Sequence, residues 1–143
     1  MLQTHEYKIL LADDDPDDRE FLLQAIKNLN QPVSMACVAD GREVLGCLSS
    51  LDEKEFPDLI VIDYKMPVLN ATDVLQKMGE EPRYRNIPVI VWSTSNQPEH
   101  IRRCLECGAV NYFTKPSSQA ELDILAEKIF DICVSSSGVN REV

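Results

Sequence analysis

The feature that most constrains the fold of this chain is a regular alternation of short apolar runs with amphipathic segments of helical periodicity. The runs are the length of strands, and most of them are rich in β-branched residues. Strands are predicted at residues 7–12, 33–38, 59–62, 88–93 and 110–113. Alternation of this kind is typical of βαβ units, with right-handed crossovers and a parallel sheet covered on both faces. The sequence therefore predicts a single α/β domain.

Capping signals mark where the intervening helices begin. Asp15 precedes Pro16, a pair that suits the N-cap and the first turn of a helix. Asp40 and Ser118 are each followed three residues later by a glutamate, which is the pattern of a capping box. A short helix is predicted at residues 72–78 and another from Pro98, with Gly108 just beyond its end. Five helices thus follow the five strands.

The third predicted strand ends in a candidate functional residue. Leu59–Ile62 is apolar without interruption, as expected for a strand buried on both faces. Asp63 follows at its carboxyl end, and Pro67 stops regular structure soon afterwards. Ligands of open α/β sheets bind at this edge. An isolated aspartate there is ordinarily a cap or a loop residue, so its significance depends on what the other strand ends contribute.

Composition excludes several classes of function. The 143 residues carry 24 acidic and 14 basic side chains, for a net charge of −10. This balance disfavours nucleic acid and anionic membranes as partners, because both require basic surfaces. The apolar runs are too short to cross a membrane, and the amino terminus lacks a signal-peptide core, so the cytoplasm is the expected location. The five cysteines are expected to be reduced, and Cys104-x-x-Cys107 lacks the further ligands of a zinc site.

Polar residues follow four of the five predicted strands. They are Asp13 and Asp14 after the first strand, Asp63 after the third, Ser93 at the end of the fourth and Lys115 after the fifth. All should meet at one edge of the sheet. Three neighbouring carboxylates repel unless a cation neutralises them, and Mg²⁺ suits a small set of oxygen ligands. Together with the lysine, such a site could stabilise a phosphoryl group, which an aspartate can accept as an acyl phosphate.

Five short motifs closely resemble the receiver domain of two-component response regulators. They are Asp13-Asp14, Asp63-Tyr64-Lys65-Met66-Pro67, Ser93-Thr94, Tyr112-Phe113 and Thr114-Lys115-Pro116, and the resemblance runs from about Lys8 to Cys133. It implies a flavodoxin-like (βα)5 fold, a doubly wound parallel sheet with strand order 2-1-3-4-5.

The resemblance also implies a role for each matched residue. Asp63 would be the phosphoacceptor and a metal ligand. Asp14 would bind Mg²⁺ directly, Asp13 partly through water, and Lys65 through its backbone carbonyl. Ser93 would hydrogen-bond the phosphoryl group. Lys115 would contact it and precede a cis-proline, Pro116, while Tyr112 would turn inward when the Ser93 hydroxyl moves.

The expected function follows from these roles. Residues 1–134 would form a stand-alone receiver and residues 135–143 a disordered tail, with no output domain. A sensor histidine kinase or a phosphotransfer protein would supply the phosphoryl group, and a downstream protein target would read the state. A homodimer is an alternative to a monomer. The chain would be a signalling protein rather than an enzyme, similar to the regulators that partner phytochrome-type or hybrid kinases.

Other interpretations of the same residues stay open at this point. The acidic run at 13–15 could merely complement a helix dipole, although that suits Asp15, Asp17 and Asp18 better than Asp13 and Asp14. Thr94 could replace Ser93, and Tyr112 could be an ordinary core aromatic residue.

Three other classes of protein compete with the receiver. A haloacid-dehalogenase-like hydrolase would need an aspartate where Lys65 stands. A flavin binder would need a phosphate loop after the first strand, where the aspartates would repel phosphate. A degenerate receiver would bind partners without being phosphorylated, but the key positions are all occupied.

Two segments are unusual for a receiver or carry no functional signal. Most receivers have a glycine after the Met-Pro pair, where this chain has Asn70-Ala71, so a different loop conformation is expected. Residues 80–86 are predicted to form a polar, exposed loop. His5 and His100 are expected to be exposed and are assigned no role.

Overall fold

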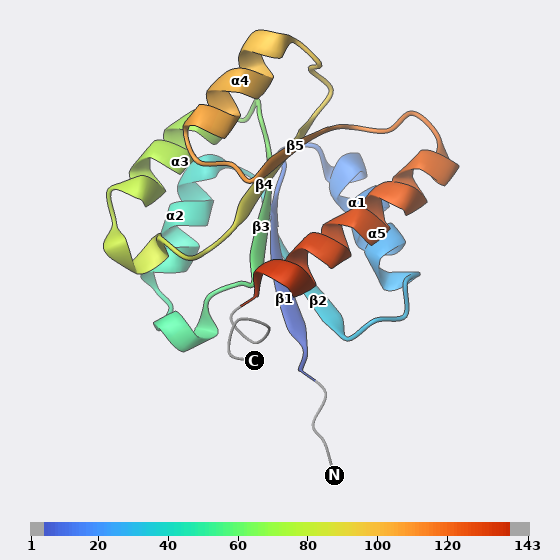
Figure 1. The fold of residues 1–143 in the computed structure, drawn as a ribbon, viewed down its shortest axis with the longest axis horizontal. Helices are drawn as coiled ribbons and strands as arrows, with labels where there is room; N and C mark the ends of the chain where they lie inside the picture. Colours follow the sequence, from blue (N-terminus) through green and yellow to red (C-terminus); the bar gives the residue numbers. More distant parts are fainter. Residues whose placement is uncertain (1–4, 138–143) are drawn as a thin grey trace.

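A computed structural model of the chain describes residues 5–137 and contains the predicted parallel sheet (Figure 1). Its strands are β1 (Tyr7–Ala12), β2 (Val33–Val38), β3 (Leu59–Asp63), β4 (Val89–Ser93) and β5 (Asn111–Thr114). They pair in the order β2-β1-β3-β4-β5, and every pair is parallel. The fold class and the strand order predicted from the sequence are therefore confirmed.

Five helices cover the two faces of the sheet. They are α1 (Pro16–Lys27), α2 (Gly41–Ser49), α3 (Ala71–Gly79), α4 (Pro98–Glu106) and α5 (Gln119–Ser136). Helices α1 and α5 pack together on one face, and α2, α3 and α4 lie on the other (Figure 1). Two short 3-10 helices, η1 (Glu53–Glu55) and η2 (Pro82–Tyr84), belong to the connections on either side of β3 and α3. None of the helices described here could span a membrane.

Alternate residues of each central strand enter two separate cores. Leu10 and Ile60 belong to the core under α2 and α3, whereas Ile9 and Val61 belong to the core under α1 and α5. All five residues of β3 are buried, which explains why its sequence shows no polar alternation. The sheet thus fixes the position of Asp63 at its centre.

The helix starts follow the predicted caps, with local differences. Asp15 accepts hydrogen bonds from the amides of Asp17 and Asp18, and Asp40 accepts one from Glu43. The glutamate of this second cap reaches the amide of Ala39 rather than that of Asp40. Gly41 is required here because a Cβ atom would lie 2.5 Å from the carbonyl oxygen of Leu69. The loop after β3 therefore packs directly on the first turn of α2.

The segment between α3 and β4 differs from the sequence-based expectation of an exposed loop. Residues 80–86 contain η2, and Tyr84 is buried with its ring 5.5 Å from that of Phe56. Arg83 lies over both rings and donates a 2.7 Å hydrogen bond to the carbonyl of Leu51. The polar composition of this loop concealed one inward-facing aromatic residue.

The carboxyl terminus also departs from the expected boundary. Helix α5 continues to Ser136, two residues into the predicted tail, and Ser137 is buried. The buried apolar residues of α5 extend as far as Cys133, and this packing supports the last turn of the helix. The remainder of that predicted tail, residues 138–143, lies outside the described part of the chain.

Candidate phosphoryl and metal site

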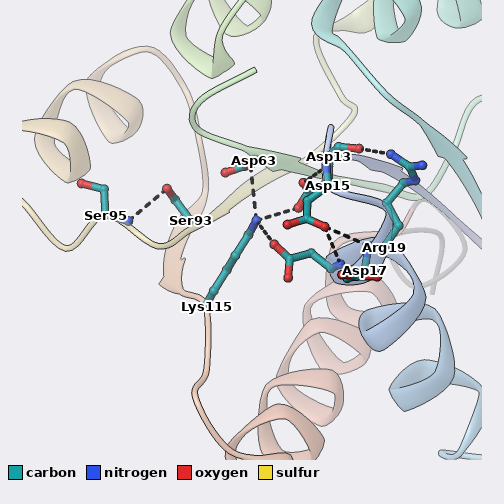
Figure 2. Close-up of polar contacts among 9 residues, drawn as sticks. Asp13, Asp15, Asp17, Arg19, Asp63, Ser93, Ser95 and Lys115 are labelled. Carbon is teal, nitrogen blue, oxygen red and sulfur yellow. Dashed lines mark hydrogen bonds and ion pairs between the residues drawn. The ribbon is translucent and has the colours of Figure 1, made fainter. Parts of the chain in front are cut away.

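The polar residues predicted from the strand ends meet at the carboxyl edge of the sheet (Figure 2). Asp63 ends β3 and Ser93 ends β4, while Asp13 directly follows β1 and Lys115 directly follows β5. The backbone amide of Lys115 donates a 2.7 Å hydrogen bond to the carbonyl of Ser93, which continues the β4–β5 ladder into the site. Strand pairing thus places four side chains from four strands around one point.

Lys115 lies at the centre of this group. Its Nζ atom is 2.8 Å from Asp13 Oδ2, 2.7 Å from Asp18 Oδ2 and 3.3 Å from Asp63 Oδ2. Only 9% of the lysine side chain is exposed, and the ammonium lies 4.9 Å from the centroid of the Trp92 ring. Figure 2 shows the extended side chain pointing between Asp63 and Asp13. The lysine is therefore the cation that these carboxylates share.

Asp13 is held rigidly but is incompletely satisfied. Its side chain is fully buried, and Oδ1 accepts a 2.9 Å hydrogen bond from the amide of Asp15. Arg19 donates a 2.6 Å hydrogen bond to its backbone carbonyl. Oδ2 accepts no hydrogen bond of regular geometry from the residues described, and the Lys115 ammonium lies 2.8 Å from it. A buried anionic oxygen in this state requires a cation beside it.

The electrostatics of Asp63 reflect its crowded position. The pKa of Asp63 is raised to about 6: burial is the main cause and the nearby Asp13 and Asp14 add to it, while Lys115 acts in the opposite direction. Burial alone would lower the pKa of Lys115, but pairing with Asp13 and Asp18 and the charge of Asp63 raise it above its ordinary value. Asp63 is thus the carboxylate whose ionisation the site disfavours, and Lys115 remains protonated.

The carboxylates fit a divalent cation. Asp13, Asp14 and Asp63 each offer one oxygen, and these oxygens lie within 4.8 Å of one another. Hard ions such as Mg²⁺ and Mn²⁺ favour oxygen ligands and commonly retain waters, for which the exposed side of Asp14 leaves room. The under-satisfied Oδ2 of Asp13 belongs to this group. Lys65 lies two residues after Asp63 with an exposed side chain, and the metal contact of its carbonyl stays a prediction.

A cavity opens between the loop that follows Asp63 and the start of α4. Its volume is about 590 Å³, and its lining includes Lys65, Ser93, Thr94 and Ser95. Ser93 is buried, and its Oγ accepts a 3.2 Å hydrogen bond from the amide of Ser95, whereas Thr94 is exposed. Both hydroxyls therefore border the same cavity, but Ser93 is the one fixed within the sheet.

Tyr112 connects β5 to the loop before α4. Its hydroxyl donates a 2.7 Å hydrogen bond to the carbonyl of Ser95, and the residue is partly buried. Burial raises the pKa of Tyr112 above its ordinary value, and hydrogen bonding to Ser93 and Ser95 lowers it in part. The ring is therefore neither an isolated core residue nor an exposed one, and its switching role stays a prediction.

Two residues that sequence reasoning gave no role contact this site. The sequence suggested only that Asp18 stabilises the start of a helix, but its side chain pairs with Lys115. The one feature of the sequence that could have pointed to this contact is its position in the first turn of α1, four residues after Asp14. His100 is partly buried. Its Nδ1 lies 2.7 Å from Ser95 Oγ, and its ring stacks on Tyr64 at 4.4 Å. No periodic pattern in the sequence marks His100.

The loop after β3 resolves the question raised by the missing glycine. Asn70 caps α3 in extended conformation and forms a capping box with Asp73, so neither Asn70 nor Ala71 has a positive φ. Positive φ occurs instead at Val68, with φ of 70°. The positive φ thus occurs three residues before Ala71, which stands where most receivers have glycine.

The proline after Lys115 does not have the conformation that the family resemblance implies. The Lys115–Pro116 peptide bond is trans, as are the other peptide bonds among residues 5–137. Cis and trans forms of a bond preceding proline differ by only about 0.5–1 kcal/mol, so local packing can select either.

Comparison with known proteins gives a consistent assignment. Residues 9–127 match the family described as "Response regulator receiver domain". The chain is 33% identical over 114 residues to the two-component response regulator ORR13 of Oryza sativa subsp. japonica, covering 80% of this chain and 90% of that protein. It is also 33% identical over 141 residues to the two-component response regulator-like APRR3 of Arabidopsis thaliana. That match covers 99% of this chain but 28% of the longer relative.

Solved structures show the same likeness. The phosphorylated cyanobacterial phytochrome response regulator RcpA is 27% identical, with a TM-score of 0.83 and coverage of 93% of this chain and 97% of that one. The Mn²⁺-bound form of the response regulator Rcp1 is 25% identical, with a TM-score of 0.76 and coverage of 86% and 91%. Both likenesses extend over nearly the whole receiver fold.

Proposed function

Because this chain belongs to the receiver-domain family of two-component response regulators, we propose that it is a phosphorylation-controlled switch with Asp63 as the phosphoacceptor. The observation that carries the proposal is the convergence of the Asp13, Asp14 and Asp63 carboxylates, two of which, Asp13 and Asp63, contact Lys115. The donor would be a phosphohistidine of a sensor histidine kinase or a phosphotransfer protein.

The proposed reaction needs an ionised Asp63. With a pKa of about 6, most of the carboxylate is ionised at neutral pH and is a nucleophile. One of its oxygens attacks phosphorus, the P–N bond of the phosphohistidine breaks, and the acyl phosphate forms on Asp63. Lys115, whose ammonium is already 3.3 Å from Asp63, would then pair with the new phosphoryl oxygens, and Ser93 would donate a hydrogen bond to them.

A bound Mg²⁺ would supply positive charge that offsets the phosphoryl oxygens during transfer. Asp13, Asp14 and Asp63 would hold it, with the carbonyl of Lys65 as a further ligand. Support comes from the Mn²⁺-bound form of Rcp1, a relative of the same fold.

The partners are proposed from the same family membership. RcpA is a phytochrome response regulator, and its likeness to this chain supports a phytochrome-type or hybrid histidine kinase as the donor, in the cytoplasm. Output would pass to a downstream protein through the surface formed by α4, β5 and α5, which a homodimer could also use. Beyond transferring and losing its own phosphoryl group, the protein would have no enzymatic activity.

Labelling with a small phosphodonor tests the central proposal. The purified protein is incubated with ³²P-labelled acetyl phosphate in Mg²⁺ or in EDTA, and alkali-labile label is counted. We expect Mg²⁺-dependent labelling that Asp63→Asn abolishes. Asp17→Asn removes an exposed carboxylate of the first turn of α1 and should be labelled like wild type. Full labelling of Asp63→Asn would refute the assignment.

A further inference from the structure

Asp18 is a third carboxylate on Lys115 that belongs to neither the strand ends nor the converging metal ligands. It lies in the first turn of α1, and its Oδ2 accepts a 2.7 Å hydrogen bond from Lys115 Nζ. This is shorter than the 3.3 Å contact between the same ammonium and Asp63. The group of converging carboxylate oxygens contains Asp13, Asp14 and Asp63 but not Asp18. Asp18 therefore touches the lysine from outside the proposed metal site.

The position of Lys115 conflicts with metal binding. Its ammonium contacts Asp13 Oδ2 and Asp63 Oδ2, which are atoms of two proposed metal ligands. A divalent cation drawn to the same oxygens would repel the ammonium, and the repulsion is strong because the lysine is largely buried. Lys115 must consequently give up part of its contact with Asp13 and Asp63 when the ion binds.

Asp18 offers the lysine a partner that the metal does not use. Its side chain is 27% exposed, so it keeps its own hydration while pairing with Lys115. The ammonium lies over the Trp92 ring, 4.9 Å from its centroid, so the ring blocks movement of the charge in that direction. A short move toward Asp18 thus separates the two cations while the lysine stays beside Asp63.

We propose that Asp18 is a positioning residue that holds the Lys115 ammonium while Asp13 and Asp63 bind the divalent cation. This inference rests on the proposed function, because it assumes that the three carboxylates bind Mg²⁺. The same contact keeps the lysine within reach of a phosphoryl group on Asp63. Without Asp18, Lys115 would compete with Mg²⁺ for Asp13 and Asp63.

A different explanation makes a different prediction. If Asp18 only complements the dipole of α1, or only adds negative charge near the site, then Asp17 should be equivalent to it. Asp17 is an exposed neighbour in the same first turn, and no contact between its side chain and Lys115 occurs in the described structure. Asp17→Asn and Asp18→Asn therefore remove the same charge from neighbouring positions, but only Asp18→Asn also removes a contact with Lys115.

The test measures metal affinity without phosphorylation. Trp92 is the only tryptophan of the chain and lies beside the ammonium, so its fluorescence should report the move of Lys115 during a Mg²⁺ titration. Binding of Mn²⁺, followed by the loss of the free-ion EPR signal, gives a second readout that does not depend on Trp92.

We expect Asp18→Asn to weaken Mg²⁺ and Mn²⁺ binding about three- to tenfold, the size of one partly buried ion pair. Asp17→Asn should weaken it less than about twofold, because solvent and salt screen an exposed charge. Asp18→Glu, which preserves the carboxylate, should restore at least half of the loss in binding free energy.

A second background that lacks the lysine identifies the cause. Lys115→Met should tighten Mn²⁺ binding, since the competing cation is gone, and Asp18→Asn should then change it less than about twofold. An equal loss from Asp18→Asn with and without the lysine would overturn the inference, as would equal effects of Asp17→Asn and Asp18→Asn. Absence of divalent binding by the wild-type protein would instead refute the metal site of the proposed function, and this inference with it.

Discussion

The hydroxyl of Tyr112 donates a 2.7 Å hydrogen bond to the backbone carbonyl of Ser95, which ties the last strand to the loop before α4. The Ser95 side chain lies 2.7 Å from Nδ1 of His100, whose ring stacks on Tyr64. Tyr64 directly follows Asp63. A continuous set of contacts therefore runs from the residue after the proposed phosphoacceptor, across the cavity, to β5.

Removing the Tyr112 hydroxyl should loosen this connection. Tyr112→Phe keeps the ring but leaves the Ser95 carbonyl without its donor, so we expect a loss of about 0.5–1.5 kcal/mol in the free energy of unfolding by urea. Amide hydrogen exchange should also accelerate in residues 94–97. Tyr7→Phe, at the opposite end of the sheet and without a hydroxyl hydrogen bond in the described structure, is the matched control. Equal losses from both variants would contradict this role for the bond.

The raised pKa of Asp63 should make its negative charge a source of instability in metal-free protein. Its folded-state pKa of about 6 exceeds the ordinary value of 3.8, so the folded state binds the proton more tightly than the unfolded state. The contribution of Asp63 to the free energy of unfolding is therefore highest at low pH and falls as the pH rises from about 4 to about 6. In EDTA at pH 7.5, Asp63→Asn should therefore raise the free energy of unfolding by about 1–3 kcal/mol.

The pH dependence separates this cause from a general effect of net charge. At pH 5 Asp63 is mostly protonated in the folded state but mostly ionised in the unfolded state, so the gain from Asp63→Asn should shrink to about half of its value at pH 7.5. Asp17→Asn removes the same formal charge at an exposed position and should change stability by less than about 0.5 kcal/mol at both pH values. A gain from Asp63→Asn that is the same at pH 5 and pH 7.5 would be inconsistent with the raised pKa.

Val68 has a strained backbone that a glycine should relieve. Its φ is 70°, and the amide of Leu69 donates to the carbonyl of Pro67 at 2.8 Å, which defines a γ-turn centred on a β-branched residue. The side chain is 62% exposed and contributes little packing. We expect Val68→Gly to stabilise the protein by about 0.5–1 kcal/mol, because strain relief exceeds the added entropy of the unfolded chain.

A second exposed valine provides the comparison. Val110 is 54% exposed and does not have a positive φ, so Val110→Gly should destabilise the protein by about 0.5–1 kcal/mol. Urea unfolding of both variants measures the difference in sign. Destabilisation of similar size in both would show that Val68 carries no relievable strain.

Strand ends explain why so much of the site could be predicted. Asp13, Asp63, Ser93 and Lys115 are each adjacent to an apolar run, and in a parallel sheet the carboxyl ends of such runs share one edge. The hydrophobic pattern alone therefore places these residues at one edge of the sheet, without any information on side-chain contacts. The prediction follows directly from topology.

The residues that escaped prediction depend on contacts between separate elements. Asp18 meets Lys115 only because the lysine side chain, which follows β5, reaches the first turn of α1, and His100 in α4 meets Tyr64 in the loop after β3. Tyr84 faces inward within a polar segment, and Val68 adopts a φ that its own side chain disfavours. The local sequence does not encode the contacts of Asp18 and His100 or the burial of Tyr84, and it disfavours the φ of Val68.

The wholly parallel sheet has a consequence for how the protein is made. Lys115 contacts Asp18 from 97 positions away and Asp63 from 52 positions away, so no local segment of the chain contains the site. Loop-closure entropy must be overcome before such distant pairs form, which favours late assembly of this edge during folding. During synthesis, Asp63 leaves the ribosome well before Lys115 does. A nascent chain would therefore expose its acidic cluster for some time without its lysine, and the charged residues around Lys115 would come together only when β5 joins the sheet.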